Sequence, residues 1–288
     1  MTIPGKPSHI LPDLVEPVNR YIHIPLAGRL VPWLKNTRIT PNQVTYASVL
    51  FGLASAYMFS LGTQPAMVAG GLLLEVTLIL DCVDGQLARA KGCASEWGRI
   101  LDGIAGYIAY LAVVFGMMRG LGDHYLPLAG LTVLTILKAI AYDYCKQTLT
   151  SIIQQGNDAT LEDIRKAYRN FKKTGSRISV LYFYYLQTQR LIFQGRWDSL
   201  AGFDEEREAA AAKALSTGKQ RTLYLHNIQP LTAVWRWNGP DLVLFLFILL
   251  AVPGILKAAL PLMVLFLGIQ FILTLLFHHF VIRNETLA

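Results

Sequence analysis

The chain has 288 residues, of which 53% are hydrophobic and only 16% charged, and its mean hydropathy is +0.39. Soluble domains are usually about a quarter charged, so this composition argues against a soluble globular protein. The formal net charge of +7 would suit nucleic acid or an anionic membrane surface. The long apolar runs favour the membrane, and we expect no nucleic-acid partner.

Residues 1–40 are predicted to form an N-terminal arm that lies in the membrane interface. The stretch 18–34 combines aromatic and aliphatic residues with Arg20 and Arg29, a composition typical of a helix on a membrane surface. An ordinary surface arm is the alternative. The first long apolar run starts only after Pro41, so we expect no signal peptide.

The apolar segments that follow are long enough to cross a hydrocarbon core. Because backbone groups in lipid must be hydrogen-bonded locally, each segment is expected to be a helix. The sequence therefore predicts an all-α, polytopic membrane bundle of about six transmembrane helices. The predicted spans are 44–61, 66–88, 98–118, 126–144, 242–260 and 262–282, and Pro253 and Gly254 are expected to shorten or kink the fifth.

These segments suggest a simple domain scheme after the arm. Residues 41–145 hold the first four spans, residues 146–240 form a polar, cytoplasmic helical insertion, and residues 241–288 hold the last two spans. Within the insertion, a capping box that begins at Thr160 predicts a helix that ends at Gly175. The aromatic stretch 178–193 is short for a span, so it is interpreted as a helix on the membrane surface or on a partner subunit.

The distribution of basic residues predicts the orientation in the membrane. Lys and Arg are concentrated in the arm, between residues 89 and 99, in the segment 146–236 and at Arg283, and they are sparse in the opposite turns. An even number of spans and the positive-inside rule then place both termini in the cytoplasm. We expect a multi-pass integral protein in the plasma membrane of a prokaryote.

Some other residues receive structural interpretations. The cysteines (Cys82, Cys93 and Cys145) form no Cys-x-x-Cys pair and no zinc spacing, so we expect reduced thiols. Trp235 and His278, near the ends of predicted spans, are expected to lie at the membrane interface.

An acidic motif beginning at Asp81 carries the clearest chemistry. On one helix, Asp81 and Asp84 share a face, and Asp102 lies on the next helix after a tight turn. Clustered carboxylates repel one another unless a cation lies among them, and oxygen ligands favour Mg²⁺ or Mn²⁺. The motif therefore predicts a metal site formed by Asp81, Asp84 and Asp102. The alternative is that Asp84 and Asp102 only form ion pairs with Arg89 and Arg99.

The other motif residues suit a phosphorylated ligand. Gly85 and Gly98 lack side chains at positions where a ligand or a neighbouring helix would come close. Arg89 can hold a phosphate group. The tight turn through Lys91 and Gly92 would bring the two helix faces together.

This segment resembles the signature of the CDP-alcohol phosphotransferases, Asp-x2-Asp-Gly-x2-Ala-Arg-x8-Gly-x3-Asp-x3-Asp. The resemblance implies a six-helix bundle, usually a homodimer, with a polar cavity open to the cytoplasm. It also implies two divalent metals that hold the pyrophosphate of a CDP-linked donor while an acceptor hydroxyl displaces CMP. Seven of the eight fixed positions match, namely Asp81, Asp84, Gly85, Ala88, Arg89, Gly98 and Asp102.

The resemblance also implies roles for these residues. Asp81, Asp84 and Asp102 would ligate metal, whereas Gly85, Ala88 and Gly98 would shape the cytidine pocket. The resemblance gives no information about the segment 146–240.

The sequence departs from this signature at its last position. Gly106 stands where the family has the Asp expected to ligate metal and act as general base. Losing a general base typically lowers the rate by roughly 10²–10⁴-fold. Three explanations remain open: a carboxylate such as Asp143 or Glu75 replaces it, the acceptor is already ionised, or the chain binds a CDP-alcohol without turnover.

The function expected from these features is transfer of a substituted phosphate group in phospholipid synthesis. The donor is expected to be CDP-linked, most simply CDP-diacylglycerol, and the acceptor an alcohol. The alternative is a catalytically impaired relative that binds a nucleotide-lipid as a regulatory or assembly subunit. A transporter is disfavoured because the acidic cluster lies at a membrane face and no inverted repeat is present.

Overall fold

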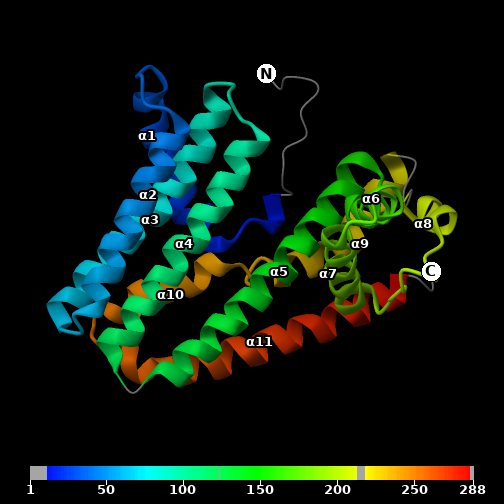
Figure 1. The fold of residues 1–288 in the computed structure, drawn as a ribbon. Coiled ribbons are helices and arrows are strands. Elements are labelled where there is room, and N and C mark those ends of the chain that lie inside the picture. The colour runs from blue at the N-terminus through cyan, green and yellow to red at the C-terminus, as the bar shows by residue number, and fades with distance from the viewer. Residues whose placement is uncertain (1–11, 123, 213–217, 286–288) are drawn as a thin grey trace. The chain divides into compact units, whose positions relative to one another are not determined.

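The computed structural model describes residues 12–122, 124–212 and 218–285 (Figure 1), so the start of the predicted arm lies outside the described residues. The described part of the chain is helical and contains no strand, which confirms the predicted fold class. The elements are η1 (Pro12–Leu14), η2 (Asn19–His23), α1 (Ile24–Lys35), α2 (Pro41–Ser60), α3 (Gln64–Ala90), α4 (Glu96–Leu121), α5 (Tyr125–Gln155), α6 (Ala159–Thr174), α7 (Arg177–Gln194), α8 (Glu205–Ala212), α9 (Gly218–Trp235), α10 (Pro240–Ala251) and α11 (Leu256–Glu285).

Five stretches of the described chain are long and apolar enough to cross a membrane. They are Gln64–Ala90, Leu101–Leu121, Tyr125–Gln155, His226–Ala251 and Leu256–Val281. The first predicted span is the 20-residue helix α2, which is not among them. It contains no charged residue, but its polar Asn, Gln, Ser and Tyr side chains lower its hydropathy. Its role as a sixth span stays a prediction.

The bounds predicted for the fifth and sixth spans are wrong. The predicted stretch 242–260 is interrupted, because α10 ends at Ala251 and α11 begins at Leu256. Between them lie Pro253, which cannot continue a helix, and Gly254, whose φ is +78°. The expectation that Pro253 and Gly254 shorten the fifth span is therefore confirmed, but residues 256–260 belong to the next helix.

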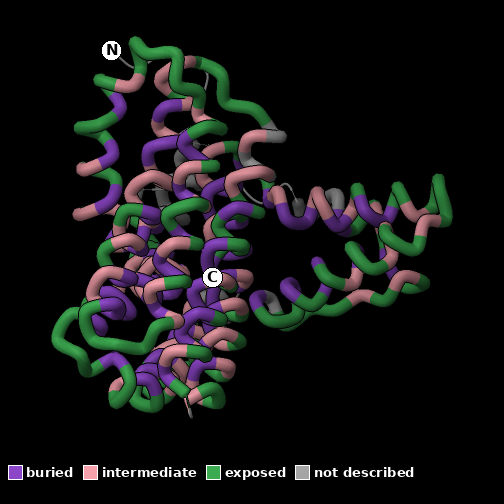
Figure 2. The backbone as a smooth tube through the Cα atoms, turned by 60° about the vertical axis from the view of Figure 1, so that its left-hand side comes forward, coloured by how far each residue is buried: buried purple, intermediate pink, exposed green. Residues whose placement is uncertain are grey.

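Large apolar side chains remain exposed on the spanning helices. Leu72 of α3 is 58% exposed, Phe115 of α4 is 67% exposed and Phe266 of α11 is 68% exposed. Buried and exposed positions alternate along the helices (Figure 2). Exposed apolar surface on this scale suits helices whose outer faces meet lipid, since soluble proteins rarely leave large contiguous apolar patches in water.

The chain divides into two compact units, one of which contains the acidic motif. This motif unit comprises residues 16–136 and 240–269. Within it α2 packs against both α3 and α4, while α1 and α10 pack against α3 (Figure 1). Its core lies among α2, α3, α4, α10 and the parts of α5 and α11 that belong to it.

Glycines let the backbones of α2 and α4 come into direct contact. A Cβ at Gly116 would lie 2.1 Å from the carbonyl oxygen of Ala56, and one at Gly120 would lie 1.9 Å from that of Phe59. Residues 116 and 120 are one helical turn apart, the small-xxx-small spacing of closely packed membrane helices. A larger residue at either position must separate the two helices.

The second unit comprises residues 12–15, 137–239 and 270–285 of the described chain. Helix α6 ends at Gly175, as predicted, with a φ of +62°, but its N-cap is Asp158 and not Thr160. Helix α7, which covers the predicted aromatic stretch, packs on α6 through Phe183 and is not among the candidate spans. The fully buried Arg190 of α7 forms ion pairs with Asp198 and Glu208 in this unit.

Two expectations for interfacial residues are wrong. Trp235 is fully buried and its indole nitrogen donates to His278 Nδ1 at 3.2 Å. His278 is only 5% exposed, and its Nε2 lies 3.0 Å from the carbonyl oxygen of Phe193. Both side chains therefore belong to the core of the second unit. The cysteines are free, as expected.

We predict that Gly116→Ala and Gly120→Ala each lower the melting temperature of the purified protein in detergent. Overpacking of a close contact typically costs about 1–3 kcal/mol, because backbone must move. Gly130→Ala is the matched control, since a Cβ there meets Val264 at an ordinary 3.9 Å. Equal melting temperatures for all three variants would contradict the backbone contact between α2 and α4.

Candidate functional site

The acidic motif lies on the last turns of α3 and the first turns of α4. Helix α3 ends in a Schellman motif: Cys93 N donates to Ala88 O at 3.0 Å and Gly92 N to Arg89 O at 3.2 Å. Gly92 has a φ of +67°, which glycine adopts without strain. Helix α4 then begins at Glu96, where the Ser95 hydroxyl caps it by accepting from Gly98 N at 3.0 Å. The chain thus turns between the helices where the sequence predicted.

A lysine and a threonine connect this turn to α2. Lys91 Nζ donates to the carbonyl oxygens of Thr37 and Ile39, at 2.8 and 2.7 Å, in the segment before α2. On α2 itself, the Thr45 hydroxyl donates to Asp84 Oδ2. Asp84 is 4% exposed, so this bond satisfies a carboxylate that water hardly reaches.

The three predicted carboxyl groups come together. Asp81 and Asp102, both half-buried, hydrogen-bond to each other, and Asp84 is close enough to act electrostatically on Asp81. Two carboxyl groups can hydrogen-bond only if one carries a proton. Arg89 also acts electrostatically on Asp84, and the Arg99 side chain lies outside those described, so the ion-pair alternative stays open.

The small residues of the motif leave unequal amounts of space. A Cβ at Gly85 would lie 3.5 Å from Arg89 Nη1, and one at Gly98 would lie 3.2 Å from Ser95 Oγ. At Gly106, which is exposed, it would meet nothing within 4 Å. Ala88 is half-buried and Arg89 exposed. Gly106 thus lies at an open surface position, whereas the roles predicted for these residues stay predictions.

The carboxyl cluster fits a divalent cation in its chemistry but is not arranged around one. In the part of the chain that the structure describes, no three His, Cys, Asp or Glu side chains are positioned to hold a metal ion. The donors are nevertheless all carboxyl oxygens, the ligands that Mg²⁺ and Mn²⁺ prefer. A bound cation would offset the repulsion among these carboxyl groups.

A fourth carboxylate, which the sequence did not identify, lies near this cluster. Asp241, at the start of α10, acts electrostatically on both Asp81 and Asp102. Its Oδ2 accepts a hydrogen bond from the Asn19 side chain. The sequence contained one signal for Asp241, because an acidic residue at the beginning of an apolar run is costly near lipid. Asp241 lies far from the motif in the sequence, however, so the spacing of the motif gave no indication that the two lie close together.

The two carboxylates predicted as possible replacements for the missing base, Glu75 and Asp143, interact with other residues. Glu75 Oε1 lies 3.3 Å from Nε2 of the buried His23. Glu75 also lies six residues before Asp81 on α3, a rise of about 9 Å along the helix. Asp143 is exposed and forms an ion pair with Lys146 at 2.8 Å.

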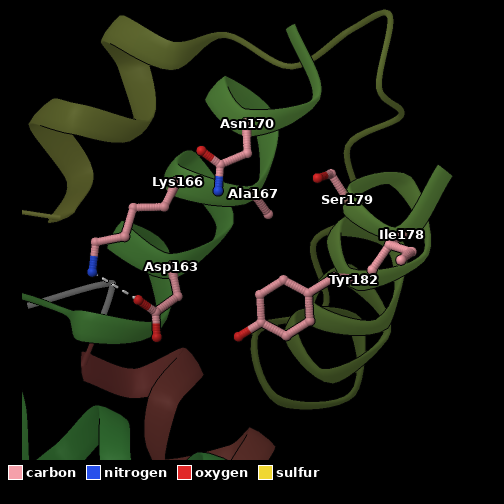
Figure 3. Close-up of a pocket in the computed structure, with 7 residues that line it drawn as sticks. All are labelled: Asp163, Lys166, Ala167, Asn170, Ile178, Ser179 and Tyr182. Atoms are coloured by element: carbon pink, nitrogen blue, oxygen red, sulfur yellow. Dashed lines mark hydrogen bonds and ion pairs between the residues drawn. The ribbon is translucent and has the colours of Figure 1, made fainter. Parts of the chain in front are cut away.

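A cavity of about 310 Å³ lies between α6 and α7 in the second unit (Figure 3). The Tyr182 hydroxyl points toward Asp163, which pairs with Lys166 at 3.0 Å. Partial burial, together with the Asp163 carboxylate, raises the pKa of Tyr182. Despite its size, this cavity contains no residue of the acidic motif. The motif is the stronger candidate site because its carboxyl groups form a donor set with defined chemistry. The lining residues are Asp163, Lys166, Ala167, Asn170, Ile178, Ser179 and Tyr182.

Comparisons with known proteins agree with the motif. Residues 38–194 match the CDP-alcohol phosphatidyltransferase domain family, a range that contains the whole motif and extends through α7. An archaetidylinositol phosphate synthase of Pyrococcus horikoshii is 34% identical over 113 residues, which cover 39% of this chain and 54% of that protein.

Two further relatives match over a similar length. A bifunctional IPC transferase and DIPP synthase of Aquifex aeolicus is 31% identical over 110 residues, 38% of this chain and 24% of that protein. A phosphatidylinositol phosphate synthase of Mycobacteroides abscessus is 29% identical over 124 residues, 41% of this chain and 53% of that protein. The chain thus spans about half, or less, of the length of these relatives.

We predict that Thr45→Val destabilises the protein, because it removes the donor to the buried Asp84 carboxylate. A lost hydrogen bond to a charged group costs about 1–3 kcal/mol. The melting temperature in metal-free detergent solution should fall, whereas Thr45→Ser, which keeps the hydroxyl, should retain most of it. An unchanged melting temperature for Thr45→Val would contradict the bond.

Proposed function

Because the chain belongs to the CDP-alcohol phosphatidyltransferase family, we propose that it transfers a substituted phosphate group from a CDP-linked donor to an acceptor alcohol and releases CMP. The observation that carries the proposal is that Asp81, Asp84 and Asp102 come together at the end of α3. They stand at matching positions of the family signature. A pyrophosphate needs positive charge near it, and these residues can bind the cation that supplies that charge.

The proposed donor is CDP-diacylglycerol, and the proposed pathway is phospholipid synthesis. Two observations support this choice. The exposed apolar faces of the spanning helices support a lipid-linked substrate, because the motif lies at the end of one of these helices. Relatives are named as synthases of archaetidylinositol phosphate and phosphatidylinositol phosphate, which are lipid products.

The residues of the motif have distinct proposed tasks. Asp81, Asp84 and Asp102 would hold Mg²⁺ or Mn²⁺, which when bound polarises the phosphoryl group and neutralises charge on departing CMP. Thr45 orients Asp84 through its hydroxyl. Arg89, exposed at the end of α3, would hold a phosphate oxygen.

The cytidine pocket would be shaped by the small residues Gly85, Ala88 and Gly98. Residue 106, a glycine with open space beside it, can take no proton. An acceptor that is already ionised would need no base at this position.

A second candidate function is binding without turnover, and Gly106 is the observation that favours it. A protein with the metal ligands but no base would hold a CDP-alcohol as a regulatory or assembly subunit. Release of CMP distinguishes the two candidates directly.

The proposed setting is the plasma membrane of a prokaryote, with both termini in the cytoplasm and the chain as a homodimer. The basic residues of the arm and of the segment 146–240 support this orientation. The predicted division into 1–40, 41–145, 146–240 and 241–288 is part of the same proposal. Helix α5 continues to Gln155 and therefore crosses the predicted boundary between residues 145 and 146.

We predict that Mn²⁺ together with CDP raises the melting temperature of the wild-type protein, because ligands that bind only the folded state stabilise it. Asp81→Asn, Asp84→Asn and Asp102→Asn should each abolish the increase. The wild type should also release CMP from CDP-diacylglycerol when suitable acceptor alcohols are screened.

The control for this prediction is Asp143→Asn, an exposed carboxylate paired with Lys146. It should keep the increase in melting temperature. If the three motif variants also keep it, the metal site is assigned to the wrong residues. If ligand binding is intact and no acceptor gives CMP, binding without turnover is the correct function.

The proposed topology is tested by labelling introduced cysteines with a membrane-impermeant maleimide. The background is Cys93→Ser, since Cys93 is exposed. Lys173→Cys, at the exposed end of α6, should react only after the cells are opened, whereas Thr63→Cys, in the turn before α3, should react in intact cells. The reverse pattern, or labelling of both in intact cells, would refute cytoplasmic termini.

A further inference from the structure

Asp241 is held next to the motif by packing and by a shared asparagine. Helix α10 packs against α3 in the motif unit. The Asn19 side chain joins the two helices, because its Nδ2 donates to Asp241 Oδ2 and its Oδ1 lies 3.6 Å from Cys82 Sγ. Cys82 directly follows Asp81, so this bridge places Asp241 beside the helical turn that carries the first motif carboxylate.

Asp241 approaches the motif carboxyl groups although like charges repel. Its carboxyl group acts electrostatically on Asp81 and on Asp102, which lie on two different helices. A role in stabilising the N-terminus of α10 would require only a position in its first turn. That role would not require proximity to two other carboxyl groups, and their repulsion opposes it.

The polar contacts around Asp241 are typical of a ligand that is held in orientation. Asn19 is itself fixed, since its Oδ1 lies 2.7 Å from His23 Nδ1. The next residue, Leu242, donates its backbone N–H to Glu16 Oε2 at 3.2 Å. Carboxylates that ligate metals are commonly hydrogen-bonded by such neighbours, which set their direction.

We infer that Asp241 is an oxygen ligand of the divalent cation at Asp81 and Asp102, and that it supplies the carboxylate that Gly106 lacks. This inference rests on the proposed function. It assigns to α10 a ligand that the family signature places on α4. Residue 106 shares a face with Asp102 one turn away and opens onto free space.

The test is a titration of the purified full-length chain with Mn²⁺ in the presence of CDP, with free Mn²⁺ measured by electron paramagnetic resonance. Asp241→Asn keeps the size of the side chain and an acceptor for Asn19 but removes the charge. It should weaken Mn²⁺ binding by roughly tenfold or more. Asp241→Glu, which keeps the carboxylate, should lose less, and Asp143→Asn should bind as the wild type does.

A second substitution separates ligation from a structural role. Gly106→Asp introduced into the Asp241→Asn protein should restore most of the lost Mn²⁺ affinity, because it returns a carboxylate to the face of Asp102. A purely structural effect on α10 would not be repaired from α4. The melting temperature of Asp241→Asn without metal should stay close to that of the wild type.

The outcomes distinguish this inference from the proposed function. If Asp81→Asn abolishes Mn²⁺ binding and Asp241→Asn binds like the wild type, the role of Asp241 is wrong and the proposed function stands. If Gly106→Asp restores no affinity, the two positions do not supply the same ligand. If the wild type binds no Mn²⁺ with CDP present, both proposals fail.

Discussion

The backbone contact between α2 and α4 is the constraint on which the site depends. Gly116 and Gly120 bring α4 against the carbonyl oxygens of α2, and α2 also packs along α3. In lipid, helices gain little from apolar burial against one another, so such close van der Waals contact has a large share in holding them together. The contact fixes α2 where Thr45 can donate to Asp84, while Lys91 fixes the segment that precedes α2.

Electrostatic repulsion among the clustered carboxyl groups opposes this packing. Asp81, Asp84, Asp102 and Asp241 lie on three helices, and each would carry a negative charge in water. Burying like charges together is costly, and the cost is relieved by a shared proton or by a cation. A divalent cation bound to these carboxyl groups, as proposed, would relieve this cost. This is the physical basis for linking the fold to phosphoryl transfer, since the same cation offsets charge on a pyrophosphate.

Much of the fold could be predicted from the sequence because its causes are local. Apolar run length predicted the helices, and the glycines at 92 and 175 marked helix ends because only a φ above zero fits there. The motif spacing placed Asp81 and Asp84 on one face. The break at Pro253 and its shortening of the fifth span were predictable too, but the start of the next helix at Leu256 was not, because hydropathy continues on both sides.

What could not be predicted depends on contacts between distant segments. Trp235 and His278 looked interfacial by position, yet they pack together in a core that also contains Phe193. Asp241 has no motif of its own, and only the packing of α10 on α3 reveals its neighbours. The capping of α6 by Asp158 was missed because Thr160 offered a second, equally good pattern.

The most direct test of the central claim is an anomalous difference map from crystals grown with Mn²⁺ and CDP. The account predicts a manganese peak within bonding distance, about 2 Å, of carboxylate oxygens of Asp81, Asp84 and Asp102, with the CDP phosphates beside it. A manganese peak away from these residues, or bound CDP with no metal at the motif, would contradict it.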